Sequence, residues 1–419
     1  MSDPLHVLVI AEACNPTWTS VPLVGYNFAR ALAERPDVKA TVVTHVRNRP
    51  GLAGDRLCDV AEVHYLDTEW IAKPLHRLGT WLRGGNGLGW TTDTALAWPS
   101  YIAFEHSVAS RFGRRLARGE FDLVHRVTPL TPTIGSPLAG MTDVPMLLGP
   151  LNGGLPWPRE YPHLRRAEKE WLVPVRKAYR ALPWYAATYR RLAGVIAGSR
   201  HTAREVPRSF RGKRFYLPEN GVDPARFPVA DDWPEPLGRF RFVTVGRLVP
   251  YKGIDLTLEA MRGANLGDAE FLVIGDGPER GRLEALATEL GLADRVRFAG
   301  WLPQKELAAE LGRSQAFVFP SLREFGGGVV LEAMARGLPC VVVDYGGPGE
   351  LVDAETGVKL PLAKREELVP RLRAGMEALA GEPARCRELG RAACRRVRAE
   401  HVWSAKAGRL VEVYQQLAG

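Results

Sequence analysis

Residues 323–337 carry the sequence Arg323-Glu-Phe-Gly-Gly-Gly-Val-Val-Leu-Glu-Ala-Met-Ala-Arg-Gly337, in which three glycines precede an apolar run. The apolar run predicts a helix, and the first N–H groups of a helix have no intrahelical acceptor. These N–H groups lie at the positive end of the helix dipole, where a phosphate binds well. The glycines let a ligand approach bare backbone. The stretch therefore predicts a phosphate-binding turn between a strand and a helix.

Two carboxylates, Glu324 and Glu332, flank this turn. Helical side chains lean toward the helix N-terminus, so Glu332, about one turn into the helix, points back toward the glycines. A carboxylate there repels a directly bound phosphate, but it can accept two hydrogen bonds from a neighbouring diol such as a ribose. We therefore expect a phosphate linked to polyols on both sides, as in a nucleotide-sugar. The alternative is an ordinary capped core helix, in which the two carboxylates have no role.

Length and composition set the frame for this site. A chain of 419 residues is too long for one ordinary core and predicts two domains, and its hydrophobic content of 46% is typical of folded soluble proteins. The net charge of +9 is compatible with binding phosphates, nucleic acid or anionic lipid, and equally with a bias in base composition. The five cysteines are scattered without CxxC spacing, which favours reduced thiols over disulfides or a zinc site. The chain has no long apolar run and no signal-peptide pattern at its start, so we expect a cytoplasmic protein.

The second half of the chain alternates strand and helix patterns. This alternation predicts a parallel, doubly wound sheet, whose ligand lies outside the carboxyl ends of the strands. Each glycine-rich turn follows an expected strand, so we assign these turns to one site. The expected elements are strands 240–245, 270–274, 296–298, 316–319 and 339–343 and helices 254–261, 280–290 and 304–311.

The first half begins with the same alternation, and two segments interrupt it. Residues 70–98, rich in Trp, Gly and Leu, predict a long loop or lid. Residues 159–200 are rich in Arg, Lys and aromatic residues, and predict either a solvated helical face or a surface that contacts a membrane or an acceptor. The expected elements are strands 5–10, 40–44, 121–125, 145–148 and 195–199 and a helix over 23–33. We expect one domain over residues 1–205 and another over 206–400.

A second motif, Gly246-Arg-Leu-Val-Pro-Tyr-Lys-Gly253, follows an expected strand and precedes an expected helix. Its two cations, Arg247 and Lys252, bracket one turn. Fixed cations can neutralise a diphosphate leaving group as its charge develops, and each oriented donor of this kind contributes on the order of 3 kcal/mol. An isolated surface pair of this kind is more often merely solvated. Glycines on both sides and the position after a central strand favour the catalytic interpretation.

In this order, the motifs closely resemble those of retaining GT-B glycosyltransferases of family 4, over residues 219–414. The resemblance includes Glu219-Asn-Gly-Val-Asp223, the Gly-Arg…Lys-Gly motif, Val273-Ile-Gly-Asp-Gly-Pro278, Val296-Arg-Phe-Ala-Gly300, the pair Glu324 and Glu332, and residues 346–350. It implies an α/β fold of two Rossmann-like domains facing across a cleft that holds the donor. It also implies that the last helix, within residues 401–419, crosses back to the first domain.

The resemblance also implies roles for single residues. Arg247 and Lys252 would grip the diphosphate beside Gly246, and Glu324 with the backbone of Phe325, Gly326 and Gly327 would hold the donor sugar. The remaining donor contacts would be backbone N–H groups of Gly328 and Val329 to phosphate, Glu332 to the ribose, and Gly275, Trp301 and Leu302 near the base. Phe325 follows Glu324 directly, whereas relatives often carry a Gly or Pro there, so contacts around the sugar 4-hydroxyl are expected to differ.

The first domain resembles the family less closely. The Gly-Gly loop that approaches the phosphates in relatives is absent, and Gly25 is the nearest equivalent. His125, at the end of an expected strand, resembles a histidine near the donor sugar, and a structural histidine is an equal alternative. Asn152 and Gly153 also follow a strand and could line the cleft.

The expected reaction is transfer of a sugar from a nucleotide-sugar to an acceptor hydroxyl, with retention by same-face displacement. A UDP-linked hexose or N-acetylhexosamine is preferred over GDP-mannose only because it is commoner in the family. The acceptor could be a glycan, a lipid-linked glycan or a small natural product. No Asp-x-Asp motif stands at a strand end, so neither a metal nor another cofactor is expected.

Three alternatives compete with this reaction. The first is a non-enzymatic basic module that binds nucleic acid or anionic membrane through residues 159–200, which leaves the two carboxylates unexplained. The second is a nicotinamide-dependent oxidoreductase, but no Gly-x-Gly-x-x-Gly follows a strand with an acidic residue about twenty positions further on. The third is a nucleotide-sugar epimerase or a phosphorylase, which the motif set fits less well. We expect no nucleic-acid partner.

Overall fold

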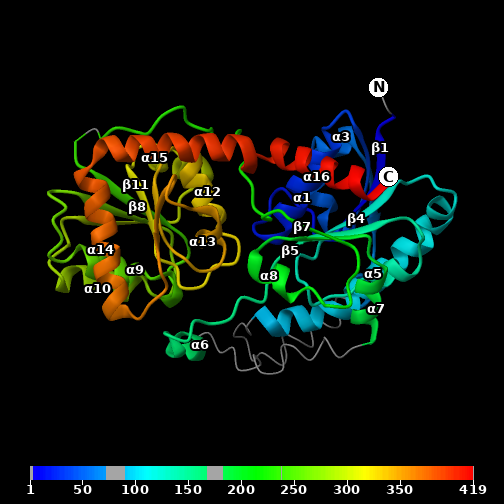
Figure 1. The fold of residues 1–419 in the computed structure, drawn as a ribbon, viewed down its shortest axis with the longest axis horizontal. Helices are drawn as coiled ribbons and strands as arrows, with labels where there is room; N and C mark the ends of the chain where they lie inside the picture. Colours follow the sequence, from blue (N-terminus) through cyan, green and yellow to red (C-terminus); the bar gives the residue numbers. More distant parts are fainter. Residues whose placement is uncertain (1–2, 72–89, 168–182, 237, 419) are drawn as a thin grey trace. The chain divides into compact units, whose positions relative to one another are not determined.

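The computed structural model describes residues 3–71, 90–167, 183–236 and 238–418, and these form two compact units (Figure 1). Unit 1 comprises residues 1–154, 165–219 and 406–419, and unit 2 comprises residues 155–164 and 220–405. The chain thus passes between the units at four places. We expected the boundary between the domains after residue 205. In the structure the main boundary falls after Glu219, and a short segment of the first half of the chain belongs to unit 2.

Unit 1 is built on a parallel sheet with the strand order β3-β2-β1-β4-β5-β6-β7. Each strand pairs in parallel with its neighbours, so all carboxyl ends lie at one edge. The strands are β1 (Leu5–Ala11), β2 (Val38–His45), β3 (Glu62–Leu66), β4 (Leu123–Thr128), β5 (Met146–Leu151), β6 (Gly194–Ala197) and β7 (Lys213–Tyr216). The central strands β1, β4 and β5 are almost wholly buried, as expected for a sheet covered on both faces.

The helices of unit 1 cover this sheet. They are α1 (Val21–Ala33), α2 (Arg49–Leu52), α3 (Leu57–Val60), α5 (Trp90–Ala117), α7 (Pro183–Arg191) and α8 (Arg200–Glu205). Helix α6 (Pro162–Ala167) starts in unit 2 and ends in unit 1, and α16 (Trp403–Ala418) lies in unit 1 from Lys406 onward. Aromatic side chains of α5 pack with β1, β4 and α7 in one core cluster.

Unit 2 has a second parallel sheet, with the strand order β10-β9-β8-β11-β12-β13. The strands are β8 (Arg241–Val245), β9 (Glu270–Ile274), β10 (Val296–Gly300), β11 (Ala316–Phe319), β12 (Cys340–Val343) and β13 (Gly357–Leu360). All pairs are parallel, so the turns that follow β8, β9, β11 and β12 share one edge of the sheet. The helices are α9 (Ile254–Met261), α10 (Arg280–Glu289), α11 (Gln304–Leu311), α12 (Gly328–Ala335), α13 (Gly347–Leu351), α14 (Arg365–Gly381) and α15 (Pro383–Arg396).

The predicted α/β class with two doubly wound, parallel-sheet units is confirmed. The predicted strands 270–274 and 316–319 and helices 254–261 and 304–311 agree with the structure to the residue. Agreement is best in unit 2 because its strands are short apolar runs between glycine turns. Such runs have no distinctive period, but their short length and the turn residues beside them identify them as strands.

Two expectations for the first half meet a different outcome. The predicted loop or lid over residues 70–98 is wrong from Trp90 onward, because α5 begins there, and residues 72–89 lie outside the described part. Residues 168–182 of the basic segment 159–200 also lie outside the described part of the chain. That this segment contacts a membrane or an acceptor therefore stays a prediction. Among the described residues, no helix is both long and apolar enough to cross a membrane.

Candidate donor site at the carboxyl edge of the unit 2 sheet

The turns after β8 and β9 touch at the carboxyl edge of the sheet. A Cβ on Gly275 would lie 2.0 Å from the carbonyl oxygen of Gly246, so any side chain there would collide with backbone. Both glycines have a positive φ, 151° for Gly246 and 128° for Gly275, which L side chains rarely adopt. The sequence therefore needs glycine at both positions, and the result is a patch of bare backbone beside the expected diphosphate cations.

The loop between β11 and α12, which carries Glu324, lies against the loop after β12. The N–H of Gly347 donates to the carbonyl oxygen of Glu324 at 3.0 Å. A Cβ on Gly346 would come within 2.1 Å of that same oxygen. This contact fixes the backbone of Glu324 and explains why Gly346 is not replaceable by a larger residue.

Helix α12 starts where the triple glycine predicts it. Gly327 precedes it in the left-handed conformation, with φ of 66°, and Gly328 is its first residue. Within the described residues, the backbone N–H groups of Gly328 and Val329 have no acceptor, whereas the N–H of Val330 donates to Gly327 at 2.9 Å. Two donors at the positive end of a helix are thus free for an anion.

The two predicted phosphate cations differ in their surroundings. Lys252 forms a hydrogen-bonded ion pair with Glu324, and the two side chains are 14% and 23% exposed. Its ammonium also lies 4.8 Å from the ring centroid of Phe319. Arg247 is exposed, and no ion pair or hydrogen bond of its side chain is found within the described residues. One cation is therefore held in place, and the other is free to close on a ligand.

Glu332 lies on α12, partly exposed, one turn from the helix start. Burial raises the pKa of its carboxyl from 4.5 to about 7, and no charged group offsets this shift. In the described part of the chain its carboxylate has no hydrogen-bond partner. A desolvated carboxyl without a protein partner is costly, and such groups cluster at functional sites.

The expected base end of the site is the loop after β10. Trp301 and Leu302 follow Gly300, whose carbonyl accepts a hydrogen bond of 2.8 Å from the N–H of Gly275. Trp301 is 75% exposed, although a tryptophan side chain is usually buried. An exposed indole beside bare backbone offers a flat surface on which a base could stack.

The predicted site residues of unit 2 therefore share the carboxyl edge of one sheet, and several of them are in direct contact, as Lys252 is with Glu324. They are Gly246, Arg247, Lys252, Gly275, Trp301, Leu302, Glu324, Phe325, Gly326, Gly327, Gly328, Val329 and Glu332. Sequence reasoning missed Asn220, which a Cβ on Gly328 would approach at 3.5 Å. Asn220 lies within the Glu219–Asp223 motif, which the sequence analysis recognised without assigning a role to this residue.

His125 of unit 1 lies in β4, fully buried. Its Nδ1 hydrogen-bonds with the hydroxyl of Tyr414 at 2.6 Å, and its Nε2 with the carbonyl oxygen of Gly149 at 2.7 Å. Burial lowers the pKa of the imidazole to about 4, so the ring is neutral at pH 7. Both ring nitrogens are in use, which favours the structural interpretation; its catalytic role stays a prediction.

Asn152 and Gly153, after β5, belong to a buried polar network. The side-chain amide of Asn152 donates to Glu219 at 2.6 Å, and its oxygen accepts from the N–H of Gly153 at 2.8 Å and from Ser199 at 3.1 Å. Asn152 is 7% exposed, and its side-chain amide forms most of its hydrogen bonds within the protein. Their cleft-lining role remains a prediction.

Gly25 lies inside α1, so it does not form a loop ahead of the helix as an equivalent of the Gly-Gly loop would. A Cβ there would lie 2.1 Å from the carbonyl oxygen of Ala13 and 3.0 Å from a methyl of Thr128. Glycine is therefore required for packing α1 against the chain after β1. Whether it also contacts a donor stays a prediction.

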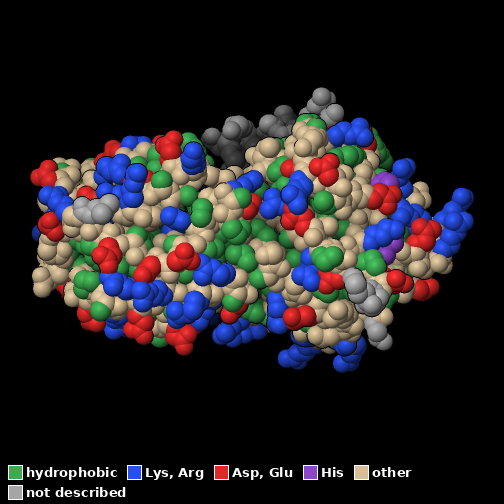
Figure 2. All heavy atoms as spheres, turned by 90° about the horizontal axis from the view of Figure 1, so that it is seen from above, with side chains coloured by type: hydrophobic (Ala, Val, Ile, Leu, Met, Phe, Trp, Pro, Cys, Tyr) green, Lys and Arg blue, Asp and Glu red, His purple; other side chains and the backbone are tan. Residues whose placement is uncertain are grey.

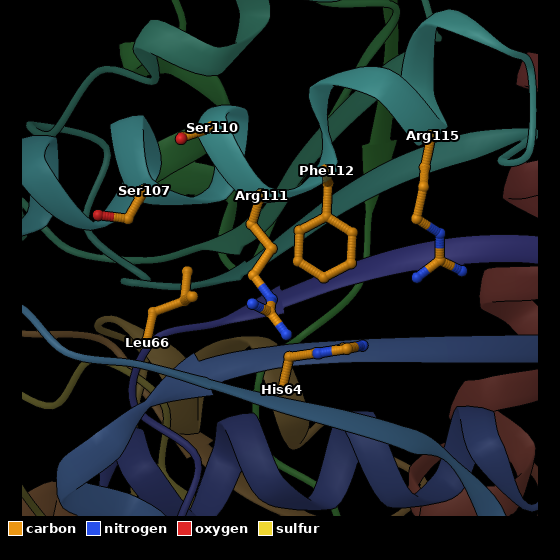
Figure 3. A pocket seen from close by; sticks show the side chains of 7 residues that line it. All are labelled: His64, Leu66, Ser107, Ser110, Arg111, Phe112 and Arg115. Carbon is orange, nitrogen blue, oxygen red and sulfur yellow. The ribbon is translucent and has the colours of Figure 1, made fainter.

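One hollow of about 610 Å³ lies in unit 1, between the edge strand β3 and α5 (Figure 3). In the figure, Arg111 extends from α5 toward His64 of β3. Two of its basic groups are already paired, because Arg115 and His64 both contact Glu62, at 3.3 and 2.7 Å. None of the predicted site residues lines it. Among the described residues, no group of three His, Cys, Asp or Glu side chains could hold a metal ion.

Comparison with known families and structures finds glycosyltransferases among the proteins that this chain resembles. Residues 229–392 match the family described as glycosyl transferases group 1. The 2-deoxystreptamine glucosyltransferase of Streptomyces kanamyceticus is 33% identical over 189 residues, 41% of this chain and 44% of that protein. The chain spans less than half the length of the curated relatives it matches.

Solved structures of low identity share the fold over nearly the whole chain. Sucrose-phosphate synthase from Thermosynechococcus elongatus superposes with a TM-score of 0.65 at 20% identity, and 99% of each chain is covered. Anabaena HepE, in complex with UDP and glucose, superposes with a TM-score of 0.59 at 16% identity, over 98% of this chain and 100% of HepE. The fold of this chain is thus GT-B, as predicted.

Proposed function

We propose that the protein is a glycosyltransferase that moves a sugar from a nucleotide-sugar to an acceptor hydroxyl. The observation that carries this proposal is the set of groups at the carboxyl edge of the unit 2 sheet. At this edge lie glycine backbone, the N–H groups of Gly328 and Val329, the guanidinium of Arg247 and the carboxyl of Glu332, and within the described residues these groups have no hydrogen-bond partner. Cations and amides suit a diphosphate, and carboxylates suit the diols on both sides of it.

In this proposal, catalysis rests on the leaving group. As the bond between the sugar and the diphosphate breaks, negative charge grows on the leaving phosphate oxygen. Lys252 and the N–H groups of Gly328 and Val329, which the fold holds in place before the reaction begins, would stabilise that charge, and the exposed Arg247 would close on it. Lys252 is positioned by its contact with Glu324 and by the ring of Phe319, so little reorganisation is needed.

Glu324 is suited to binding the donor sugar. Its carboxylate is engaged by Lys252, and its backbone oxygen by the N–H of Gly347. An ion-paired, anchored carboxylate is better placed to accept sugar hydroxyls than to act as a covalent nucleophile. This favours retention by same-face displacement, in which the leaving phosphate oxygen takes the proton of the acceptor hydroxyl. The bond from the anomeric carbon to the phosphate oxygen breaks as the bond to the acceptor oxygen forms.

The donor we propose is a UDP-linked hexose or N-acetylhexosamine. The exposed indole of Trp301 beside Gly275 leaves room for a base, and HepE, which shares the fold, was solved with UDP and glucose. The acceptor is a hydroxyl of a glycan, a lipid-linked glycan or a small natural product; the related S. kanamyceticus enzyme is named for an aminocyclitol. No metal or other cofactor is required in this scheme, because fixed cations and amides already face the diphosphate.

The alternative of a non-enzymatic basic module is less well supported. On the face shown in Figure 2, Lys and Arg side chains are interspersed with Asp and Glu and do not gather into one continuous patch. Many arginines are also paired, as with Arg391 and Asp232 at 2.7 Å. Binding of nucleic acid or anionic lipid needs unpaired positive charge along a surface.

A thermal-shift screen tests the proposal. UDP, GDP and ADP, each free and linked to glucose or N-acetylglucosamine, are titrated against the purified chain. One base is expected to raise the melting temperature, because a ligand at 100 times its Kd stabilises the folded state by about 2.7 kcal/mol. Lys252→Ala should weaken this shift. The exposed lysine Lys305, on α11, supplies the matched control Lys305→Ala, which should not. If no nucleotide or nucleotide-sugar raises the melting temperature, the proposal is wrong.

A further inference from the structure

A ten-residue segment of the first half of the chain, Leu155–Leu164, belongs to unit 2. We call it the strap. It follows β5 of unit 1, leaves that unit after Gly154 and returns to it at Arg165. Its apolar side chains are buried, with Leu155, Trp157, Tyr161 and Leu164 between 3% and 9% exposed. The strap is therefore an integral part of the unit that carries the proposed donor site.

The strap contacts the loop of Glu324 through Arg323. The guanidinium of Arg323 lies between two aromatic rings, 4.3 Å from the centroid of Trp157 and 5.0 Å from that of Phe325. Its Nε donates to the carbonyl oxygen of Leu155 at 3.2 Å. Arg323 is only 9% exposed, and a buried cation is costly unless it is well bound. Stacking on an aromatic face and a hydrogen bond to a carbonyl are the contacts that hold a guanidinium best.

The strap also contacts the other side of the ion pair. Trp157 packs edge-to-face against Tyr251, with 5.9 Å between ring centroids. Tyr251 immediately precedes Lys252, and its carbonyl oxygen accepts from the N–H of Leu322 at 2.8 Å. Trp157 thus touches the chain neighbours of both members of the Lys252–Glu324 pair. In a third contact, the hydroxyl of Tyr345 donates to the carbonyl oxygen of Pro156 at 2.8 Å. This hydrogen bond connects the strap to the loop after β12, which binds the Glu324 backbone.

We propose that Trp157 and Arg323 are positioning residues that set the geometry of the Lys252–Glu324 pair for donor cleavage. This inference rests on the proposed function. It adds a positioning role for two residues, which could not be inferred from the Arg323–Gly337 motif alone. Neither residue needs to touch the donor. Trp157 acts through Tyr251 on Lys252 and through Arg323 on Glu324, and a displacement of about 1 Å in such a pair can cost up to 100-fold in rate.

The contacts argue against a role in fold stability alone. A well-packed apolar residue in place of Arg323 would fill a buried site without the cost of desolvating a charge. The guanidinium adds direction, because its plane fixes the rings on both sides and its Nε fixes the strap backbone. Phe325, which stands directly after Glu324, supplies the second ring of this stack.

The test is a double-mutant cycle on cleavage of the nucleotide-sugar selected by the binding screen, followed as release of the nucleoside diphosphate. Trp157→Ala is expected to lower kcat by about 10- to 100-fold. In the Lys252→Ala background the same change is expected to lower kcat by a clearly smaller factor than in the wild type, because one of the two residues through which Trp157 acts is already gone. Trp157→Phe keeps a ring and should retain at least a third of the wild-type kcat. Arg323→Lys keeps the charge but loses the planar stack and the Nε hydrogen bond, and should lower kcat more than Trp157→Phe does.

Trp233 provides the matched control. It is also a buried tryptophan of unit 2, 4% exposed, and its Nε1 donates to Gln315 at 2.8 Å, away from the site. Trp233→Ala should lower the melting temperature at least as much as Trp157→Ala and leave kcat within threefold of wild type. Equal losses of kcat from both tryptophan variants, or fully additive losses with Lys252→Ala, would overturn the inference. A wild-type protein that binds no nucleotide-sugar would instead refute the proposed function, which the screen detects first.

Discussion

The carboxyl edges of the two sheets can be compared directly, because both units are parallel and doubly wound. At the edge of unit 2, Arg247, Glu332 and the N-terminus of α12 keep hydrogen-bonding capacity that the described residues do not use. In unit 1, His125 within β4 and Asn152 after β5 form their hydrogen bonds within the protein, His125 with Tyr414 and Gly149 and Asn152 with Glu219. The same architecture thus has one edge with polar groups that lack a protein partner among the described residues, and one edge near which the polar groups are paired within the protein.

This difference separates functional from structural polar residues. A buried polar group must be paired, so unused capacity at a buried or half-buried position costs stability and is retained where a ligand supplies the partner. This criterion predicts that Glu332 is a ligand group and that His125 and Asn152 are structural. Three substitutions sharpen or break the comparison, from the largest expected effect to the smallest.

The largest effect is expected from Lys252→Ala. Loss of one oriented donor to the leaving group should lower kcat by roughly 10²–10³-fold. The folded state should be retained, because Lys252 contributes a polar contact at a partly exposed position. The measurement is donor cleavage at saturating nucleotide-sugar, with Lys305→Ala as the control. Unchanged turnover at saturation would rule out the leaving-group role.

Glu332→Gln should separate binding from stability. Without a carboxylate to accept the ribose hydroxyls, the Kd for the nucleotide should rise about tenfold, as expected for loss of a charged hydrogen bond of about 1.5 kcal/mol. Isothermal titration calorimetry at pH 8 measures this change. An unchanged Kd would mean that Glu332 does not contact the nucleotide.

The same variant has a predicted pH signature. The folded chain holds the Glu332 proton more tightly than the unfolded chain, because burial raises the pKa from 4.5 to about 7. The stability contributed by this proton is fully present below pH 4.5 and is lost as the pH rises to about 7. At pH 8, Glu332→Gln should therefore raise the free energy of unfolding, by about 1 kcal/mol after allowance for solvent screening. Equal stability differences at pH 5 and pH 8 would contradict the assignment.

The smallest effect on turnover is expected from His125→Phe. The change leaves the Tyr414 hydroxyl and the Gly149 carbonyl buried without their partner, so the free energy of unfolding should fall by about 1 to 3 kcal/mol. The kcat at a temperature well below the melting transition should stay within threefold of wild type. Tyr414→Phe, which removes one of the two hydrogen bonds, should cost less stability. A loss of 100-fold or more in kcat would restore His125 as a catalytic residue.

Much of unit 2 could be predicted from local sequence. Its strands are short apolar runs bounded by glycine, and the positions of Gly246, Gly275 and Gly327 follow from turns that need positive φ. The start of α12 at Gly328 follows from the same logic. The helix over residues 90–98 was missed because tryptophan, threonine and glycine around it obscure the helical period, and packing of α5 in the unit 1 core outweighs that weak local preference.

The sequence by itself determined the order of the elements, the glycine turns at the carboxyl ends of the strands, and the residue types that suit a diphosphate between two polyols. These are local properties, set by backbone conformation and by the chemistry of each side chain. Only the tertiary structure decided that Lys252 pairs with Glu324, that both ring nitrogens of His125 are used internally, and that Leu155–Leu164 packs in the second unit. Such outcomes depend on contacts between residues far apart in the chain, and no local pattern specifies which distant partner a polar group will meet.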